Sequence, residues 1–519
     1  MKTSFRILPF FFYFTALLAT YLVRNHPFFW DTIQLASKHA HFFYDTDFQS
    51  LILPENIDSG HPPAFGMYLA LVWKIFGKTL TVSHFAMLPF LWGIVFFIFK
   101  IGERLGGKEN AHWLPLLCFA DPVLASQSIL VSPDVVVVCF FLAAVWAILK
   151  NLPPASQEKR EKNFFSKNFS LSKILFDLRL ALAIVGLGLI SMRGMMLAAG
   201  LFLFSLFSSI EKYSWRLILQ KILPFVPGGL LAAGYLFLHW QKTGWVGYHA
   251  GSPWSPSFER VDLQGFVKNV AVLGWRMVDF GRVFVWAGIL ACCLFWAKGW
   301  QAQPFRKFET FGKVISGSGN LSESFKLSER WATTLAFLLA TVFLAIVPTQ
   351  LFYKGLLAHR YLLPVFLVLT FLFFHLAVQS KFKKPLILLA FLSLATGNFW
   401  VYPKNIATGW DSTLAHLPWY DLRQEMLDFL DESKIDLAQV GTAFPSVGDQ
   451  KFVDLSNRKN GFEEKDLQRQ CFIFYANVMN DFTDAEIDEL EINWQEIKRL
   501  ERGGVCLILY KNPNRQCEN

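Results

Sequence analysis

The 519-residue chain is 53% hydrophobic and 17% aromatic, and only 17% of its residues are charged. Soluble globular proteins carry about 25% charged residues, so the deficit excludes an ordinary soluble protein and indicates repeated apolar segments. The formal net charge of +9 does not indicate a nucleic-acid partner, because the basic residues lie between apolar segments, as they do in the cytoplasmic loops of membrane proteins.

Apolar segments begin close to the N-terminus. Residues 1–6 are basic and residues 7–23 are apolar, and no small-residue cleavage site follows, which predicts an uncleaved first span and a cytoplasmic N-terminus. The segment at 64–76 follows two prolines and is too short to span, so we expect a juxtamembrane helix there. Counting every segment able to cross ~30 Å of hydrocarbon gives about eleven spans, and those after the first centre on residues 82–102, 112–130, 134–149, 174–192, 195–210, 217–239, 280–297, 331–352, 361–380 and 385–402.

Basic residues alternate from one connection to the next and set the predicted topology. An odd number of spans places the region after Tyr402 outside the cytoplasm. We therefore predict a multi-pass protein of the inner (plasma) membrane with a periplasmic C-terminal region. Two predicted outside loops, 24–63 and 241–268, are long, and long ordered loops often carry function. The connections rich in Lys and Arg, which should be cytoplasmic, lie near residues 100–108, 150–173, 212–221, 298–330 and 381–384.

From residue 403 the composition becomes that of a soluble domain. The sequence thus divides into an all-α membrane domain, residues 1–402, with an outer loop and juxtamembrane helices at 24–77, and a small extracytoplasmic α/β domain, residues 403–519. Cys471 and Cys506 open two of its predicted strands, and a disulfide between them is one option outside the cytoplasm. The predicted elements are helices at 420–433 and 484–490 and buried strands at 439–444, 471–475 and 505–510.

Ionisable residues at the predicted outer face are the candidate site, because charge near hydrocarbon is costly and marks function. Asp31 follows the first span and suits two roles equally, a helix N-cap or a general base. Asp58 precedes Gly60-His61-Pro62-Pro63, where two prolines stop the chain and start a helix. This turn fixes His61 in a place where it could bind a phosphate or a sugar hydroxyl.

Three further positions carry charge at the start of predicted spans. Asp134 belongs to Ser132-Pro133-Asp134, which also reads as ordinary helix capping. Arg193-Gly194 lies between two spans, and His359-Arg360-Tyr361 opens a later one. An arginine at such a boundary either snorkels to water or binds a phosphate with its fork of donors.

The order of these motifs resembles the lipid-linked-sugar glycosyltransferases of the GT-C fold. The resemblance is closest to glycosyltransferase family 39 and its relatives, which include protein O-mannosyltransferases and the ArnT-like aminoarabinose transferases of lipid A. Thr32 departs from the family, which has a second acid there. In the first part of the chain, the acid after the first span is Asp31, the basic residue before Pro-Pro belongs to His61-Pro62-Pro63, and the short helix ending in Phe-Gly is Ala64 to Gly77. Further on, the Pro-Asp before a span is Pro133-Asp134, the Lys-Gly or Arg-Gly turn is Arg193-Gly194, and the late Arg-Tyr-x-x-Pro is Arg360 to Pro364.

The resemblance implies sugar transfer from a polyprenyl-phosphate donor to a hydroxyl of a lipid, glycan or protein acceptor at the outer face of the membrane, with inversion. Asp31 would be the catalytic base, and the alternative is a substitute acid from the same loop, Asp45, Asp47, Glu55 or Asp58. His61, Arg193 and Arg360 would be cations that stabilise the leaving phosphate, and Asp58, Asp134 and Tyr361 would complete the substrate site. No cofactor is implied. A divalent metal stays open, because Asp31, His61 and Asp134 are ligand types without the spacing of a metal motif.

Two other function classes fit a polytopic chain. A lipid or solute transporter would show internal repeats and ionisable residues at mid-membrane, whereas no clear repeat is present and the charges lie at one boundary. An O-antigen ligase or polymerase would carry its important residues in a large late loop, whereas the first loop is the richest here. A non-catalytic membrane protein is the remaining alternative.

Overall fold

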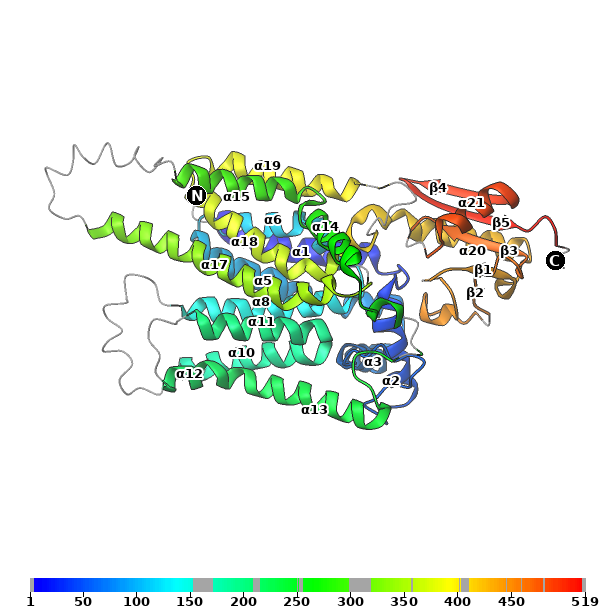
Figure 1. Cartoon of the computed structure of the whole chain (residues 1–519), viewed down its shortest axis with the longest axis horizontal. Coiled ribbons are helices and arrows are strands. Elements are labelled where there is room, and N and C mark those ends of the chain that lie inside the picture. Colours follow the sequence, from blue (N-terminus) through cyan, green and yellow to red (C-terminus); the bar gives the residue numbers. More distant parts are fainter. Residues whose placement is uncertain are drawn as a thin grey trace.

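The computed structural model is a long helical bundle with a small α/β domain at one end (Figure 1). It describes residues 4–152, 171–208, 215–249, 251, 255–297, 319–355, 358–400, 402, 410–444, 446–458, 460–478 and 481–515. The main helices of the bundle are α1 (Ser4–Val23), α5 (Leu88–Gly106), α6 (Trp113–Ala120), α7 (Pro122–Ser128), α8 (Pro133–Asn151), α10 (Leu171–Ile190), α11 (Met192–Phe207), α13 (Val226–Thr243), α14 (Leu263–Val278), α15 (Arg282–Ala297), α17 (Gly319–Leu351), α18 (Leu363–Gln379) and α19 (Lys383–Thr396).

Apolar composition and proline placement explain these helices. Prolines occupy the first turn of α5, α7, α8 and α18, where the missing N–H costs nothing. The segment that contains α18 is 89% buried, and α18 packs against α17, α15, α5 and α6. Its aromatic and aliphatic side chains therefore form the centre of the core, while the outward faces of α13 and α17 expose large apolar side chains such as Leu230 and Leu344.

The helix lengths do not confirm the predicted count of about eleven spans. In the described residues, the segments long and apolar enough to cross a membrane are Leu80–Gly106, Pro133–Asn151, Ile218–Thr243, Glu329–Leu351 and His359–Gln379, and the pair α14 and α15, bent by 80°, adds a sixth if it counts as one span. The predicted span at 112–130 is divided at Asp121-Pro122 into α6 and α7. Shorter apolar helices include Pro9–Val23, Ala64–Phe76, Leu178–Ile190 and Met192–Phe207.

Basic residues gather at the bundle end far from the α/β domain. Arg104, at the end of α5, donates to the carbonyl of Leu152 at 2.5 Å and lies 5.1 Å from the Trp331 ring of α17. Lys383, at the start of α19, donates to Asn110 at 3.3 Å. Several connections expected to be cytoplasmic therefore meet at one end, and the N-terminus lies there too (Figure 1).

Short helices cover the other end of the bundle. The first long loop contains a π-helical turn, η1 (Ile33–Lys38), and α2 (His39–Asp45). The predicted juxtamembrane helix is present as α3 (Ala64–Phe76), followed by α4 (Leu80–Phe85). A 3-10 turn, η5 (His359–Leu362), leads into α18, and another, η7 (Trp410–Ser412), precedes the α/β domain.

The α/β domain is a five-stranded sheet with a helix on each face. The strand order is β2-β1-β3-β5-β4, in which β1 runs parallel to β2 and β3 and the other pairs are antiparallel. Apolar residues of α20 pack on one face of the sheet and those of α21 on the other. The elements are β1 (Val440–Thr442), β2 (Glu463–Glu464), β3 (Phe472–Ala476), β4 (Gln495–Arg502), β5 (Val505–Lys511), α20 (Pro418–Glu432) and α21 (Asp484–Asn493).

Two features of this domain differ from expectation. The strands β4 and β2 were not predicted, because their polar residues lack the apolar run of a buried strand. The option of a Cys471–Cys506 disulfide is wrong, since Cys471 is disulfide-bonded while Cys506 is free. Cys506 belongs to β5, where its neighbour Leu507 pairs with Ala476 of β3.

The α/β domain docks on the loop that immediately precedes Asp31. His26 stacks on Tyr420 with 4.0 Å between ring centroids, and Trp30 meets Phe444 at 4.9 Å. Phe29 is fully buried in the same apolar cluster as Trp410 and Trp419. The position of Asp31 therefore depends on packing between both parts of the chain.

Candidate functional site

Arg360 is the centre of a buried ion cluster at the bundle end that carries the α/β domain. Its guanidinium forms close ion pairs with Asp31 and Asp411 and a third, at 3.5 Å, with Asp134. Arg193 reaches the other oxygen of Asp134 at 3.0 Å. The cluster thus sets three carboxylates against two guanidinium groups, which leaves one formal negative charge.

Asp31 is the most accessible acid of this cluster. Its side chain is 21% exposed, against 13% for Asp134 and 5% for Asp411. Thr32, which replaces the family's second acid, holds the turn instead: its hydroxyl accepts from the N–H of Phe29 and donates to the Phe29 carbonyl, both at 2.8 Å. The Asp31 carboxylate forms an ion pair with Arg360. It therefore belongs to the charged cluster, whether it acts as a helix N-cap or as a general base.

Backbone strain accompanies this arrangement. Trp30, next to Asp31, has φ +54°, a left-handed conformation that costs a bulky residue free energy and persists where surrounding packing enforces it. The Phe444 ring of the α/β domain provides that packing. Strained residues concentrate at functional sites, which supports a functional role for this turn.

The α/β domain also brings charge toward Asp31. Burial and the carboxylates of Glu464 and Asp31 raise the pKa of Asp481, whereas the Lys465 ammonium opposes them. Asp481 lies shortly before the start of α21. The rim of the site around Asp31 is therefore formed in part by the C-terminal domain.

Arg193 lies between an acid and a ring. Its guanidinium is 4.0 Å from the centroid of the Tyr361 ring and 3.0 Å from an oxygen of Asp134. Arg193 Nη1 is buried and has no hydrogen-bond partner among the residues that the structure describes. The residue after it, Gly194, allows α11 to start tightly against α10, because a Cβ there would lie 2.1 Å from the carbonyl oxygen of Leu187.

His61 is a neutral group rather than a cation. The backbone N–H of Met192 donates to its Nδ1 at 3.2 Å, so the proton resides on Nε2. Burial, with help from the positive charges of Arg193 and His39, lowers the pKa of His61 to about 3. His61 therefore lies near Arg193, as the sequence pattern predicts, but can act only as a hydrogen-bond donor at neutral pH.

Asp58 belongs to a separate pair. Its carboxylate accepts from the N–H of Gly60 at 2.8 Å and lies 2.8 Å from His239 Nε2 of α13, with both side chains buried. His239 Nδ1 faces the carbonyl of Trp245 at 3.0 Å. Gly60 has φ +72°, and a Cβ there would be 2.0 Å from the carbonyl oxygen of Gly247. Asp58 thus ties the first long loop to α13, and its contacts are with Gly60 and His239 rather than with the Arg360 cluster.

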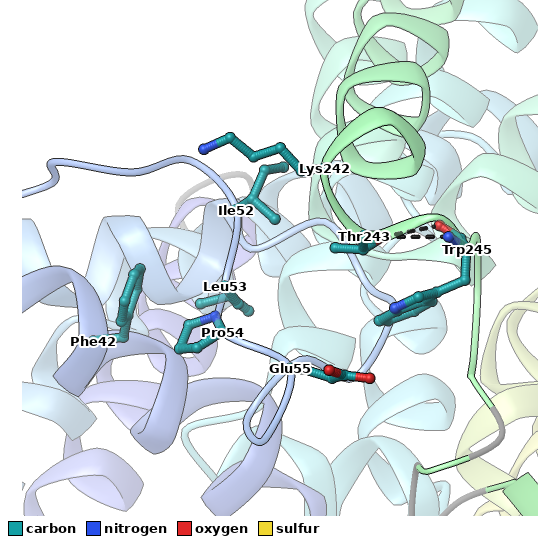
Figure 2. Close-up of a pocket in the computed structure, with 8 residues that line it drawn as sticks. All are labelled: Phe42, Ile52, Leu53, Pro54, Glu55, Lys242, Thr243 and Trp245. Atoms are coloured by element: carbon teal, nitrogen blue, oxygen red, sulfur yellow. Dashed lines mark hydrogen bonds between the residues drawn. The ribbon is translucent and has the colours of Figure 1, made fainter.

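A cavity of about 390 Å³ lies beside this pair, between the first long loop and the end of α13 (Figure 2). Lys242 and Glu55 supply its charged groups, and Trp245 supplies an aromatic wall. The remaining lining residues are Phe42, Ile52, Leu53, Pro54 and Thr243. In the described part of the chain, no group of three metal-ligand side chains is arranged to hold an ion, and Asp31 and Asp134 are joined instead through Arg360.

Sequence reasoning missed several buried charges. Arg282 of α15 donates to both oxygens of Asp121, at 2.7 and 2.8 Å. Asp279, at the bend between α14 and α15, lies 2.9 Å from His359 Nε2 and accepts from Tyr402. The sequence did contain a signal for Asp121, because an acidic residue inside a predicted membrane span is unusual. Asp279 and Arg282 likewise adjoin or open a predicted span.

Comparisons with known proteins address the fold. Neither a family model nor a curated protein matches the chain in sequence. The structure of ArnT from Cupriavidus metallidurans bound to undecaprenyl phosphate is similar over 96% of this chain and 97% of that chain, with a TM-score of 0.50 and 11% identity. The apo structure of the same ArnT aligns over 72% of this chain and 59% of that chain, with a TM-score of 0.43 and 13% identity. The chain is therefore a multi-pass membrane protein with the ArnT-like GT-C fold.

Proposed function

We propose that this protein is a glycosyltransferase that moves a sugar from a polyprenyl-phosphate donor to an acceptor hydroxyl. The observation that carries the proposal is the ion cluster in which Arg360 holds Asp31, the most exposed of three acids, at one end of the bundle. A structure with the same fold is bound to undecaprenyl phosphate, which supports a lipid-phosphate donor. A carboxylate that is held but accessible is suited to general-base catalysis.

The reaction is a single displacement with inversion. The acceptor oxygen forms a bond to the anomeric carbon while the bond from that carbon to the phosphate oxygen breaks. Asp31 takes the hydroxyl proton, and the polyprenyl phosphate leaves with the electron pair. Arg360 orients the Asp31 carboxylate, because its Nη2 donates to Asp31 while its Nη1 donates to Asp411.

The leaving phosphate is assigned to Arg193 and His61 rather than to Arg360. Arg193 Nη1 has no hydrogen-bond partner within the described ranges of the chain, and a preorganised cation stabilises charge that develops in the transition state. His61 contributes a neutral N–H from Nε2, since Nδ1 is occupied by Met192. Arg360, already shared by three acids, has little positive charge left to offer a phosphate.

The site is proposed to lie at the outer face of the inner membrane, with the N-terminus in the cytoplasm and the α/β domain in the periplasm. The basic residues Arg104 and Lys383 lie at the opposite end of the bundle, as cytoplasmic loops do. A reporter active only outside the cytoplasm, fused after Asn519, should be active. A cytoplasmic reporter signal there would contradict this topology.

Replacement of Asp31 by Asn tests the function. Transfer from a panel of polyprenyl-phosphate sugars should fall by about 10²–10⁴-fold, which is the usual worth of a general base. Asp47→Asn is the matched control, because Asp47 is an exposed acid of the same loop paired with Lys74, and Asn tolerates its φ of +51°. Normal transfer by folded Asp31→Asn enzyme would contradict the proposal.

A further inference from the structure

Asp411 is the third acid that pairs with Arg360. It lies outside the sequence motifs that supply Asp31, Asp134 and Arg360. It lies in η7, between the last helix of the bundle and the α/β domain, and its carboxylate pairs with Arg360 Nη1. Its side chain is only 5% exposed. An acid so enclosed is poorly placed to take a proton from an acceptor, so its role must be exerted through Arg360.

A closed circuit of polar contacts holds Asp411 and Asp134 on either side of Arg360. The Asp411 carbonyl accepts from Ser126 Oγ at 2.9 Å and from Gln127 Nε2 at 2.8 Å. Gln127 Oε1 accepts from the Ser132 hydroxyl at 2.6 Å, and that hydroxyl accepts from the N–H of Asp134 at 3.2 Å. The ion pair between Asp134 and Arg360 Nε completes the circuit.

The planar geometry of a guanidinium links the directions of its donors, so the contacts on one side of Arg360 affect the donor that faces Asp31. Its donors lie in one plane in a fixed fork, so fixing two corners fixes the third. Asp411 accepts a hydrogen bond from Nη1, and Asp134 lies 3.5 Å from Nε as an ion pair without a hydrogen bond. Nη2 is then directed at Asp31 and at the Tyr361 hydroxyl, which is 3.2 Å away. Without Asp411 the plane could rotate about its remaining contacts, and the direction of the donor that orients Asp31 would no longer be set.

We propose that Asp411 is a positioning residue that fixes Arg360 so that Asp31 is oriented for proton transfer. The inference rests on the proposed role of Asp31 as the base. Its neighbour Trp410 is buried in the apolar cluster that also contains Phe29 and Trp419. Docking of the α/β domain and completion of the catalytic cluster are therefore linked through two adjacent residues.

Asp411→Asn keeps the shape of the side chain and removes its charge. Misplacement of a catalytic group by about 1 Å can cost about 10²-fold in rate, so kcat should fall by roughly that factor. The KM for the donor should not rise, because the phosphate is assigned to Arg193 and His61. Asp411→Glu, which keeps the charge, should retain more activity than Asp411→Asn.

Asp454→Asn is the matched control. It breaks a buried pair in the same domain, in which Asp454 lies 2.9 Å from Arg423, without touching the Arg360 cluster. Folded Asp454→Asn enzyme should have a normal kcat even if its Tm is lower. An equal loss of kcat in both variants, or a normal kcat in Asp411→Asn, would overturn the positioning role.

A second variant decides the matter if Asp411→Asn does not fold. Gln127→Leu removes the link between Asp411 and Ser132 while leaving every charge in place, and it should lower kcat without raising the donor KM. A normal kcat in Gln127→Leu would overturn the inference in that case. If Asp31→Asn is inactive and Asp411→Asn is normal, only the positioning role fails. If both are normal, the proposed function fails as well.

Discussion

Arg360 and Asp31 are 329 residues apart in the chain, and their side chains form an ion pair where the helical bundle meets the α/β domain. The pair joins the turn after the first helix to the turn before α18. Because Asp134 and Asp411 pair with the same guanidinium, one side chain organises acids from three other segments of the chain. The predictions below test what this arrangement does.

Arg360→Lys should lower kcat by about 10²-fold, although it keeps the positive charge. A lysine ammonium is a point charge on a flexible stem and lacks the planar fork that holds three acids in fixed directions. The measurement is kcat per folded enzyme, with Tm recorded alongside because buried acids lose a partner. A Lys variant with a normal kcat would show that charge alone suffices.

Arg193→Gln should raise the donor KM and lower kcat, together by about 10–100-fold in kcat/KM, the worth of a hydrogen bond to a charged group. Steady-state kinetics with varied donor and direct binding of undecaprenyl phosphate measure the effect. Arg179→Gln is the control, since Arg179 lies on α10 against the Trp146 ring and outside the cluster. Equal donor binding by Arg193→Gln and unaltered protein would remove Arg193 from the phosphate site.

Gly194→Ala should abolish most activity, because the added Cβ would lie 2.1 Å from a backbone oxygen of α10 and the start of α11 would have to move. Arg193 would move with it. Gly229→Ala provides the contrast: nothing lies within 4 Å of its added Cβ, and alanine favours a helix by roughly 0.5–1 kcal/mol. Activity and Tm of the two variants give the comparison, and similar behaviour would contradict the tight contact.

Acid should destabilise the protein, because several histidines are buried in neutral form. Burial lowers the pKa of His39 and His416 to about 4 and that of His61 to about 3. The unfolded chain binds these protons below pH 6.5, whereas the folded chain binds them only near pH 3–4, so stability falls as pH drops through this window.

Thermal unfolding in detergent at pH 7.5 and pH 5.0 measures this dependence. His416 has Nδ1 against the Thr413 carbonyl, stacks on Phe29 and is near His26. His416→Phe should therefore weaken the dependence of Tm on pH while keeping the ring contact. An equal or higher Tm at pH 5.0 in the unaltered protein would contradict the prediction.

The grouping of the candidate residues was largely accessible from the sequence. Asp31, Asp134, Arg193, Arg360 and Tyr361 do lie together, because each stands at the same end of an apolar segment and such ends meet on one side of a bundle. Asp58 was grouped with them by its closeness to His61, yet it pairs with His239 of α13. Closeness along a loop does not determine which way a side chain points.

Asp411 could not be found in this way. It belongs to a stretch of ordinary polar composition, where a charged residue is not unusual and does not point to a buried partner. Its partner Arg360 is 51 residues earlier in the chain. Asp121 and Arg282 differ, because both lie at or within apolar segments and their charge required a partner. That partnership, 161 residues apart, was still not readable without the packing of α15 against α18 and its neighbours.

The sequence by itself determined that this is a membrane protein of many helices, because long apolar segments must satisfy their backbone hydrogen bonds internally in hydrocarbon. It also predicted the ArnT-like fold, through the order of a few motifs. Only the tertiary structure decided how the charges are shared: among the residues that it describes, Arg360 pairs with three acids, Arg193 keeps one donor without a partner, and His61 is neutral. Those properties depend on burial and on distances between residues far apart in the chain, which no local pattern encodes.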